Sequence, residues 1–99
     1  MEKKIKLVSV KPAEDGKHKF VATFDVDGKG RDVKFGVKGS FSYVDGASVS
    51  VRDAYRARHR AEGVNPDSMA KGPLSYWITW GDSQNLLKNI SEYKKRYNV

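Results

Sequence analysis

Three arginines at helical spacing are the residues of this sequence best suited to bind an anion. Arg52, Arg56 and Arg60 recur at every fourth position, so they form a basic ridge along one side of a helix. Like charges at this spacing weaken an isolated helix by roughly a few tenths of a kcal/mol per pair. Two readings stay open. The ridge faces phosphates or a carboxylate-rich surface, or it is a solvated face whose partners, such as Asp53, Glu62 or the aspartates of the predicted sheet, lie elsewhere in the fold.

The opposite side of the same helix carries mostly small side chains, and we expect it to pack on the rest of the protein. It contains Val51, Ala54, Tyr55, Ala57, Arg58 and Ala61. A buried guanidinium without a partner costs several kcal/mol. We therefore interpret Arg58 as a structural anchor that pairs with a carboxylate or with backbone carbonyls. His59 lies at the edge of this side and is also interpreted as structural.

Tyr76, Trp77 and Trp80 form the densest aromatic cluster of the sequence. At helical spacing Trp77 and Trp80 share a face and Tyr76 lies beside Trp80, so most of the cluster is interpreted as core. The alternative is a platform of rings at an interface, or a surface on which nucleic-acid bases stack.

A second basic segment, Lys94-Lys95-Arg96, lies in the last turn of the last predicted helix. Its charges complement the helix dipole and need no further role, but they also offer a second surface for phosphates. Our candidate binding surface therefore consists of the arginine ridge and this segment.

Several kinds of catalytic and metal site have no candidate residues. The sequence contains no cysteine, which excludes a disulfide, a thiolate nucleophile and a cysteine zinc site. Its two histidines, His18 and His59, fall in different halves with no acid at ligand spacing beside either. We find no arrangement for nucleophilic or acid–base catalysis and no glycine-rich phosphate loop. The sequence therefore predicts a non-enzymatic protein without a metal ion or a cofactor.

The overall charge favours an anionic partner. Nineteen Lys and Arg residues against twelve Asp and Glu residues leave a formal charge of +7 on 99 residues. Such a balance favours nucleic acid, acidic protein surfaces or anionic lipid headgroups as partners, although it also serves solubility alone. The sequence shows no apolar run of a signal peptide and no window near the roughly 20 apolar residues of a membrane span. We expect a soluble, intracellular protein that is not secreted.

The first part of the chain, residues 1–40, has the alternating pattern of β-strands. Phe20–Val26 and Val33–Val37 place apolar side chains at every second position. Between them, Asp27-Gly28-Lys29-Gly30 supplies the glycines of a hairpin turn. Ile5–Val10 is a third candidate strand. These features predict a three-stranded antiparallel meander with one apolar face to cover.

The second part, residues 50–97, has the spacing of helices. Ser50 followed by Asp53 resembles a capping box, which predicts a helix from Ser50 to about Ala61 with Gly63 as its terminator. The chain is thus predicted to be one domain, residues 1–99.

Two further helices follow in the pattern. Pro73 suits the start of a short helix that Gly81 ends, and Asp82 or Ser83 caps the last helix. Its apolar stripe is formed by Leu86, Ile90, Tyr93 and Tyr97. The predicted class is α+β, with the N-terminal meander covered by two or three C-terminal helices.

Three segments give the sequence a resemblance to a known family. They are Tyr55-Arg56-Ala57-Arg58-His59, Leu74–Gly81 and Tyr93-Lys94-Lys95-Arg96-Tyr97. Over roughly residues 41–97, outside the strands, the sequence resembles a family of small uncharacterised proteins encoded by large double-stranded DNA viruses of algae and amoebae. The resemblance implies a viral accessory or virion protein and brings no catalytic residues with it.

Three functions are open at this point. The one we favour is a non-enzymatic structural or interaction protein, a minor capsid-associated component of the virion. The second is a basic protein that binds nucleic acid without sequence specificity through the candidate binding surface. The third is an adaptor or inhibitor of a host protein, anchored by Tyr76, Trp77 and Trp80. All three place the protein in the virion or in the host cytoplasm.

Overall fold

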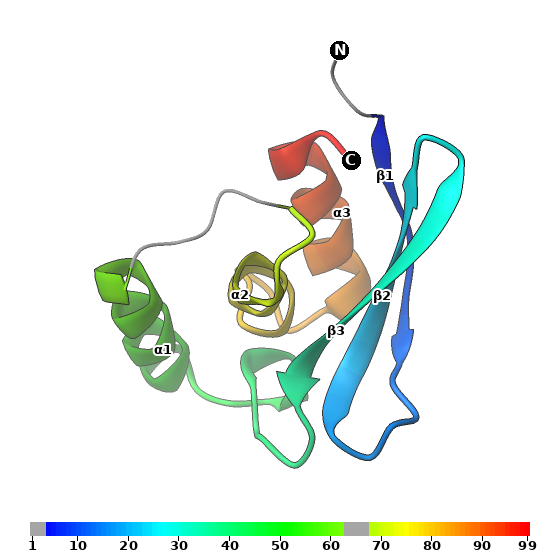
Figure 1. Ribbon diagram of the computed structural model, residues 1–99. Coiled ribbons are helices and arrows are strands. Elements are labelled where there is room, and N and C mark those ends of the chain that lie inside the picture. The colour runs from blue at the N-terminus through cyan, green and yellow to red at the C-terminus, as the bar shows by residue number, and fades with distance from the viewer. Residues whose placement is uncertain (1–3, 63–67) are drawn as a thin grey trace.

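The computed structural model describes residues 4–62 and 68–99. Its strands are β1 (Ile5–Pro12), β2 (His18–Val26) and β3 (Lys29–Val37). They are followed by the helical elements η1 (Tyr43–Asp45), α1 (Val49–Glu62), α2 (Lys71–Leu74), η2 (Ser75–Thr79) and α3 (Leu86–Tyr97). This order confirms the predicted α+β class, in which an N-terminal meander precedes the helices (Figure 1).

The three strands pair in the order in which they occur in the sequence. β2 lies in the centre and runs antiparallel to both neighbours. β2 and β3 meet at the predicted hairpin, where Asp27 (φ 53°) and Gly28 (φ 87°) both have positive φ, as a type I′ turn requires. A bulge between Leu7 and Ser9 shifts the register of β1. On a regular strand, side chains three residues apart lie on opposite faces. The extra residue of the bulge lets Leu7 and Val10 both contribute to the core.

The core lies between one face of the sheet and the layer formed by α2, η2 and α3 (Figure 1). Phe24 and Phe35 of the sheet are fully buried together with Leu74, Ile78 and Tyr93 of the helical layer. Burial of each large apolar side chain stabilises the fold by roughly 1.5–3 kcal/mol. This layer therefore provides most of the hydrophobic stabilisation, and it fixes the helices on which the candidate sites are built.

η2 is a π-helical turn, where the sequence predicted a regular short helix from Pro73. The backbone N–H of Trp80 donates to the carbonyl of Ser75 (2.9 Å), and so does the hydroxyl of Thr79 (2.8 Å). A π-turn is wider than an α-turn, and it points the two tryptophans at different neighbours. Trp77 lies against α3, and Trp80 lies against α1.

α1 begins slightly earlier than predicted. Its first residue is Val49, and the hydroxyl of Ser48 accepts a hydrogen bond from the N–H of Val51 (3.2 Å). The capping box predicted from Ser50 and Asp53 is therefore wrong, because the chain uses the earlier serine. The predicted terminator, Gly63, lies outside the described residues.

α3 begins slightly later than predicted. Asn85 caps it by accepting a hydrogen bond from the N–H of Lys88 (3.2 Å), so the prediction of Asp82 or Ser83 as the cap is wrong. Asp82 and Ser83 instead belong to the connection between η2 and α3. This placement leaves the carboxylate of Asp82 available to residues of α1.

α1 lies outside the helical layer (Figure 1) and contacts it mainly through the side that carries Arg52 and Arg56, together with Tyr55 from the side predicted to pack. The side that was expected to pack is exposed at Val51, Ala54, Ala57, Arg58 and Ala61. The packed side has half-buried residues, which are Arg52, Tyr55, Arg56 and His59. Alanine offers little apolar surface to bury, whereas rings and the stems of arginines cover much more.

Candidate binding sites

Arg56, the central residue of the arginine ridge, is bound within the protein. Its Nη1 donates to Oδ1 of Asp82 (2.8 Å), and its guanidinium lies over the rings of Tyr76 (5.0 Å) and Trp77 (5.1 Å). The side chain is only 13% exposed. Arg56 therefore joins α1 to the helical layer and is not a free phosphate contact.

The other two arginines of the ridge also have partners in the fold. Arg52 donates from Nε to Oδ1 of Asp53 (3.1 Å) and lies over the ring of Tyr43 (4.7 Å). Arg60 donates from Nη1 to the hydroxyl of Tyr76 (2.9 Å). Of the two readings of the ridge, these contacts support the one with intramolecular partners. Sequence reasoning named Asp53 among those partners and missed the contribution of Asp82.

The arginine contacts change the ionisation of their partners. The hydrogen bond from Arg56 lowers the pKa of Asp82. Burial acts to raise the pKa of Tyr76, but the guanidinium groups of Arg56 and Arg60 outweigh burial and lower it. Asp82 is therefore fully ionised at neutral pH, where its attraction for Arg56 is strongest.

The two residues interpreted as structural have different positions. Arg58 is exposed because its side of α1 faces away from the helical layer, and the anchoring contact predicted for it does not occur among the described residues. His59 is half-buried, and its ring lies 4.8 Å from that of Tyr55 and 5.9 Å from that of Tyr76. His59 thus belongs to the contact between α1 and the helical layer.

The aromatic cluster connects three helical elements. Tyr76 is buried, whereas Trp77 and Trp80 are half-buried. Trp80 stacks on Tyr55 of α1, with ring centroids 4.5 Å apart and planes inclined by 14°. The guanidinium of Arg96 in α3 lies 3.6 Å from the ring centre of Trp77. Most of the cluster's surface is therefore used inside the protein.

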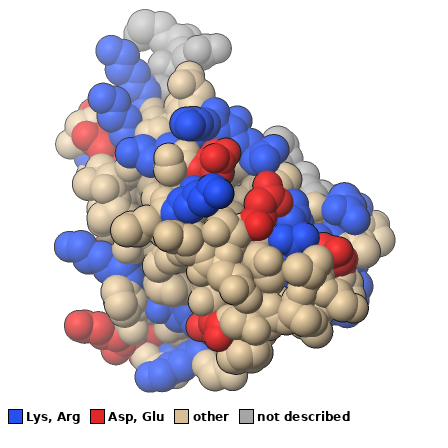
Figure 2. Space-filling model, turned by 180° about the vertical axis from the view of Figure 1, so that it is seen from behind, with Lys and Arg blue, Asp and Glu red and all other residues tan. Residues whose placement is uncertain are grey.

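Four lysines line a groove between the start of β1 and the end of α3. The groove has a volume of about 660 Å³, and we call its basic residues the lysine groove: Lys4, Lys6, Lys94 and Lys95. None of them forms an ion pair with a carboxylate of the described residues. Asp25 and Asp27 line a smaller hollow beside two of the lysines. Figure 2 shows Lys and Arg side chains across the upper part of one face, with acidic residues among them and further Lys and Arg at its left, right and lower edges.

The lysine groove differs from the basic segment predicted at the end of α3. Arg96 does not line the groove, because its guanidinium lies over Trp77. Lys4 and Lys6 of the N-terminal segment line it instead. The end of the chain is joined to β1 by a hydrogen bond from the N–H of Leu7 to the carbonyl of Val99 (3.1 Å). The sequence pattern contains no signal for this long-range contact, and so Lys4 and Lys6 were missed.

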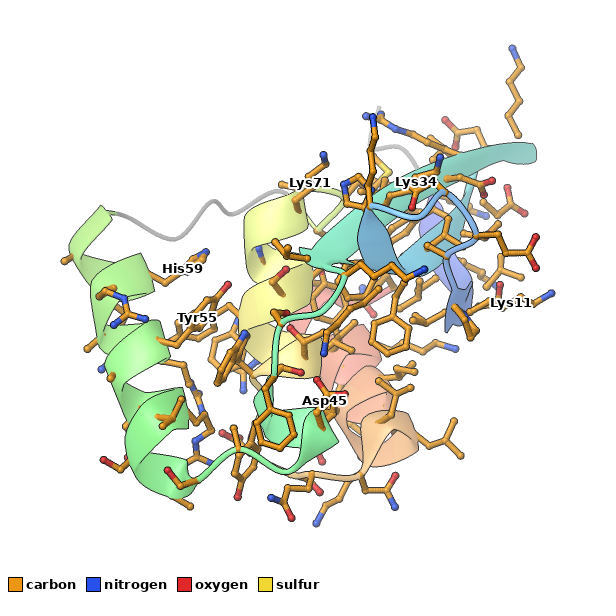
Figure 3. The ribbon with its side chains drawn as sticks, turned by 90° about the horizontal axis from the view of Figure 1, so that it is seen from below. Lys11, Lys34, Asp45, Tyr55, His59 and Lys71 are labelled. Atoms are coloured by element: carbon orange, nitrogen blue, oxygen red, sulfur yellow. The ribbon has the colours of Figure 1, made fainter. Side chains whose placement is uncertain are left out.

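A second cavity, which we call the aromatic cleft, lies between α1, η2 and the end of the sheet. Its volume is about 510 Å³, and its lining includes His18, Tyr55, Lys71 and Trp80. Figure 3 shows Tyr55 reaching from α1 toward α2. A neighbouring hollow of about 490 Å³, which we call the basic hollow, shares His18 and Lys71 with the cleft and is also lined by Lys34.

His18 is fixed at the junction of the two cavities by Asp15. One carboxylate oxygen of Asp15 lies 2.6 Å from Nδ1 of His18, and the other accepts the backbone N–H groups of Lys17 and His18 (2.9 Å each). Nζ of Lys34 lies 3.6 Å from the same carboxylate. The hydrogen bonds from His18 hold the pKa of Asp15 far below its ordinary value.

Neither a metal site nor a membrane span is present in the part of the chain that the structure describes. Within residues 4–62 and 68–99, no group of three His, Cys, Asp or Glu residues is placed to hold a metal ion. The helices in these ranges are all too short or too polar to cross a membrane.

Comparison with known proteins assigns the chain to a family. Residues 8–59 match the sequence profile of a family of unknown function, DUF5754. The chain belongs to this family. It is also 33% identical over 73 residues to uncharacterized protein L851 of Acanthamoeba polyphaga mimivirus, an alignment that covers 68% of this chain and 73% of that protein. No solved structure matches the chain.

These matches confirm the resemblance to uncharacterised proteins of large DNA viruses. The resemblance was placed at roughly residues 41–97, outside the strands. The family match extends it to the strands, because it covers most of the sheet and α1 up to His59. Trp77, Trp80 and the lysines of α3 lie outside the family match.

Proposed function

We propose that this protein is a non-enzymatic component of the particle of a large DNA virus and that it acts by binding an anionic partner. Membership in a family with a mimivirus protein supports the viral context. The structural observation that carries the proposal is the lysine groove, whose four ammonium groups have no carboxylate partner among the described residues. Unpaired charges of one sign attract a partner of the opposite sign and speed its association.

Quantitative mass spectrometry of purified particles tests this proposal. We expect the protein in particles of the virus that encodes it, and we expect washes of rising salt concentration to release it, because salt screens exposed charges. Abundant non-structural proteins of the infected cell serve as the control for contamination. Its absence from particles that retain their other minor components would contradict the proposal.

A specific observation also favours nucleic acid as the anionic partner. Lys4 and Lys6 are two residues apart on an extended segment, so their side chains project about 7 Å apart on the same side. This is close to the spacing of successive phosphates along a strand. Lys94 and Lys95 face the same groove from α3. The arrangement fits contact with a phosphate backbone without reading of bases, as our second candidate function requires.

A salt titration against a fluorescent DNA duplex tests the second candidate. Each phosphate contact contributes about −0.9 to the slope of log K against log salt, so four lysines predict a slope of about −3 to −4. The triple variant Lys6→Ala, Lys94→Ala and Lys95→Ala should reduce the slope to about −1. A control with the same charge loss carries Lys11→Ala, Lys17→Ala and Lys88→Ala, all exposed outside the groove.

The outcomes separate the possible partners. Loss of binding in the groove variant alone would support nucleic acid, whereas equal loss in the control would assign binding to net charge. Absence of binding at low salt would exclude nucleic acid and leave an acidic protein surface of the particle as the partner. The host-adaptor function is not proposed, because the rings that were to anchor it are packed against α1 and α3.

A further inference from the structure

The aromatic cleft and the basic hollow are neighbouring cavities with different chemistry. They share His18 and Lys71 in their linings, so these two side chains lie at the boundary between them. Figure 3 shows Lys71 and Lys34 on the same side of the molecule and Tyr55 between α1 and α2. Each cavity has a volume of about 500 Å³, within the range of roughly 300–1,000 Å³ typical of small-molecule sites.

The cleft end suits a flat ring. Tyr55 and Trp80 stack on each other and both line the cleft, together with Val37, which is 69% exposed. Their mutual stack occupies the ring faces that they turn to each other, so a planar ligand contacts the remaining ring surface of this pair by stacking or edge-on. The hydroxyl-bearing residues Ser40 and Ser75 also line the cleft. They provide hydrogen-bonding groups for the polar edge of a base.

The hollow end suits an anion. Its lining includes Arg31, Lys34 and Lys71 beside His18. Lys71 is exposed and forms no ion pair within the described part of the chain. A ligand that reaches this end therefore meets one free ammonium and further positive groups.

Two carboxylates lie close to this end, and both are already hydrogen-bonded. Asp32 lines the hollow and accepts a hydrogen bond from the hydroxyl of Thr23 (2.8 Å). Asp15 accepts two backbone N–H groups and lies beside the His18 ring. With Nδ1 of His18 directed at Asp15, the other ring nitrogen, Nε2, is left for a ligand.

We propose that this composite site binds a nucleoside phosphate. The base lies against the Tyr55–Trp80 wall of the aromatic cleft, and the phosphate lies in the basic hollow between His18, Lys34 and Lys71. A neutral ring would leave the ammonium groups unused, and inorganic phosphate would leave the aromatic wall unused. The site is independent of the lysine groove, which lies at the other end of the sheet and shares no residue with it.

Binding of adenosine monophosphate, followed by tryptophan fluorescence and by calorimetry, tests the proposal. Trp80 lines the cleft and Trp77 does not, so quenching reports on occupancy of the cleft. We expect adenosine monophosphate to bind at least about tenfold more tightly than adenosine or inorganic phosphate, since only the nucleotide makes both stacking and charge-assisted contacts. Equal affinity for inorganic phosphate and for the nucleotide would overturn the role of the aromatic wall.

Variants of exposed residues keep the test separate from folding. Lys71→Ala should weaken nucleotide binding about fivefold to tenfold, as the loss of one charge-assisted contact predicts. Lys88→Ala removes the same charge from an exposed position outside the lysine groove and outside both cavities of this site, and it should leave nucleotide binding unchanged. An equal effect of the two variants, or no binding of the nucleotide at millimolar concentration, would overturn the proposal.

Two sources of the same chemistry are distinguished with a short oligodeoxyadenylate. Binding of the free nucleotide alone would identify a mononucleotide as the ligand. Tighter binding of the oligonucleotide, lost in Lys71→Ala and retained in the triple variant of the lysine groove, would identify a single strand that enters the cleft. In either case the nucleoside phosphate is the unit recognised.

Discussion

Arg56 joins α1 to the helical layer through contacts with three residues at once. Its guanidinium pairs with Asp82 and lies over Tyr76 and Trp77, while its Nε has no hydrogen-bond partner among the described residues. An exposed ion pair alone contributes roughly 0–1 kcal/mol, and Asp82 is 67% exposed. The stacking on two rings therefore provides most of the stabilisation.

The first prediction follows from these contacts. Arg56→Ala should lower the free energy of unfolding by about 1–3 kcal/mol. The free energy of unfolding of Arg56→Lys should lie between those of the wild type and Arg56→Ala, because an ammonium does not stack as a planar guanidinium does. Urea unfolding measures the change. The control is Arg58→Ala on the exposed side of the same helix, which should stay within about 0.5 kcal/mol of the wild type. Equal losses at both positions would contradict the packed orientation of α1.

Gly81 is required by the close approach of η2 to α3. A β-carbon at this position would lie 2.2 Å from the carbonyl oxygen of Trp77 and 2.7 Å from Cγ of Asn89. Asn89 is buried and has no room to move, since its amide donates to the carbonyls of Ile78 (2.9 Å) and Ser83 (2.6 Å). The glycine thus allows the amide to bind both segments of the connection.

The second prediction concerns this contact. Gly81→Ala should destabilise the protein by about 3 kcal/mol or more, because backbone and a hydrogen-bonded side chain must both shift. Gly30→Ala in β3 is the control, since a β-carbon there meets no atom within 4 Å. Thermal unfolding of the two variants gives the comparison, and a wild-type melting temperature for Gly81→Ala would show that the connection is looser than described.

At the scale of elements, the sheet could be predicted from sequence and the orientation of α1 could not. Strand alternation and the Asp27-Gly28 turn are local signals, and both were confirmed. The two sides of α1 are ambiguous in sequence, because one has mostly small residues, the other has three arginines, and Tyr55 lies at the boundary between them. The choice between them depends on Asp82 and on the rings of η2, which are distant in sequence.

The candidate sites also depend on contacts between residues distant in sequence, which local sequence patterns do not predict. Lys94 and Lys95 could be identified from their charge, but their neighbours Lys4 and Lys6 depend on the pairing of Leu7 with Val99. The aromatic cleft depends on the π-turn of η2, which turns Trp80 toward α1. A periodic pattern assumes a regular helix, and so it gives no indication of a widened turn.

The third prediction concerns the attachment of α1. This helix contributes none of the buried residues of the core cluster, and among the described residues it is held by rings and guanidinium groups. Tyr55→Ala removes the stack on Trp80 and should raise amide hydrogen exchange throughout α1, while the amides of β2 keep their protection. Ala57→Ser on the exposed side is the matched control. Uniformly faster exchange in both elements would mean that α1 and the sheet unfold together.

At the scale of the whole molecule, several aspartates form ion pairs within the protein, whereas the lysines of the groove do not. Asp15, Asp45, Asp53 and Asp82 are all engaged by Lys, Arg or His side chains. The lysine groove is left without such partners within the described residues. The four aspartates therefore stabilise contacts within the fold, whereas the lysines of the groove stay accessible to a partner.

The last prediction follows from this use of the acids. Hydrogen bonds from His18 and from Arg56 depress the pKa of Asp15 and of Asp82, respectively, in the folded state. A depressed pKa contributes stability that is fully present above the unfolded value, about 3.9 for Asp, and is lost as the pH falls through the folded value. The melting temperature should therefore be nearly constant from about pH 8 to pH 5 and fall below about pH 4.

The double variant Asp15→Asn and Asp82→Asn isolates the contribution of these two groups. It should melt at a lower temperature than the wild type at neutral pH, and its melting temperature should decline less as the pH falls, because two of the titrating groups are gone. The two curves should approach each other in strong acid, where both aspartates of the wild type become protonated. Parallel curves over the whole range would mean that other carboxylates dominate acid unfolding, and that the contacts of Asp15 and Asp82 are not what couples this fold to pH.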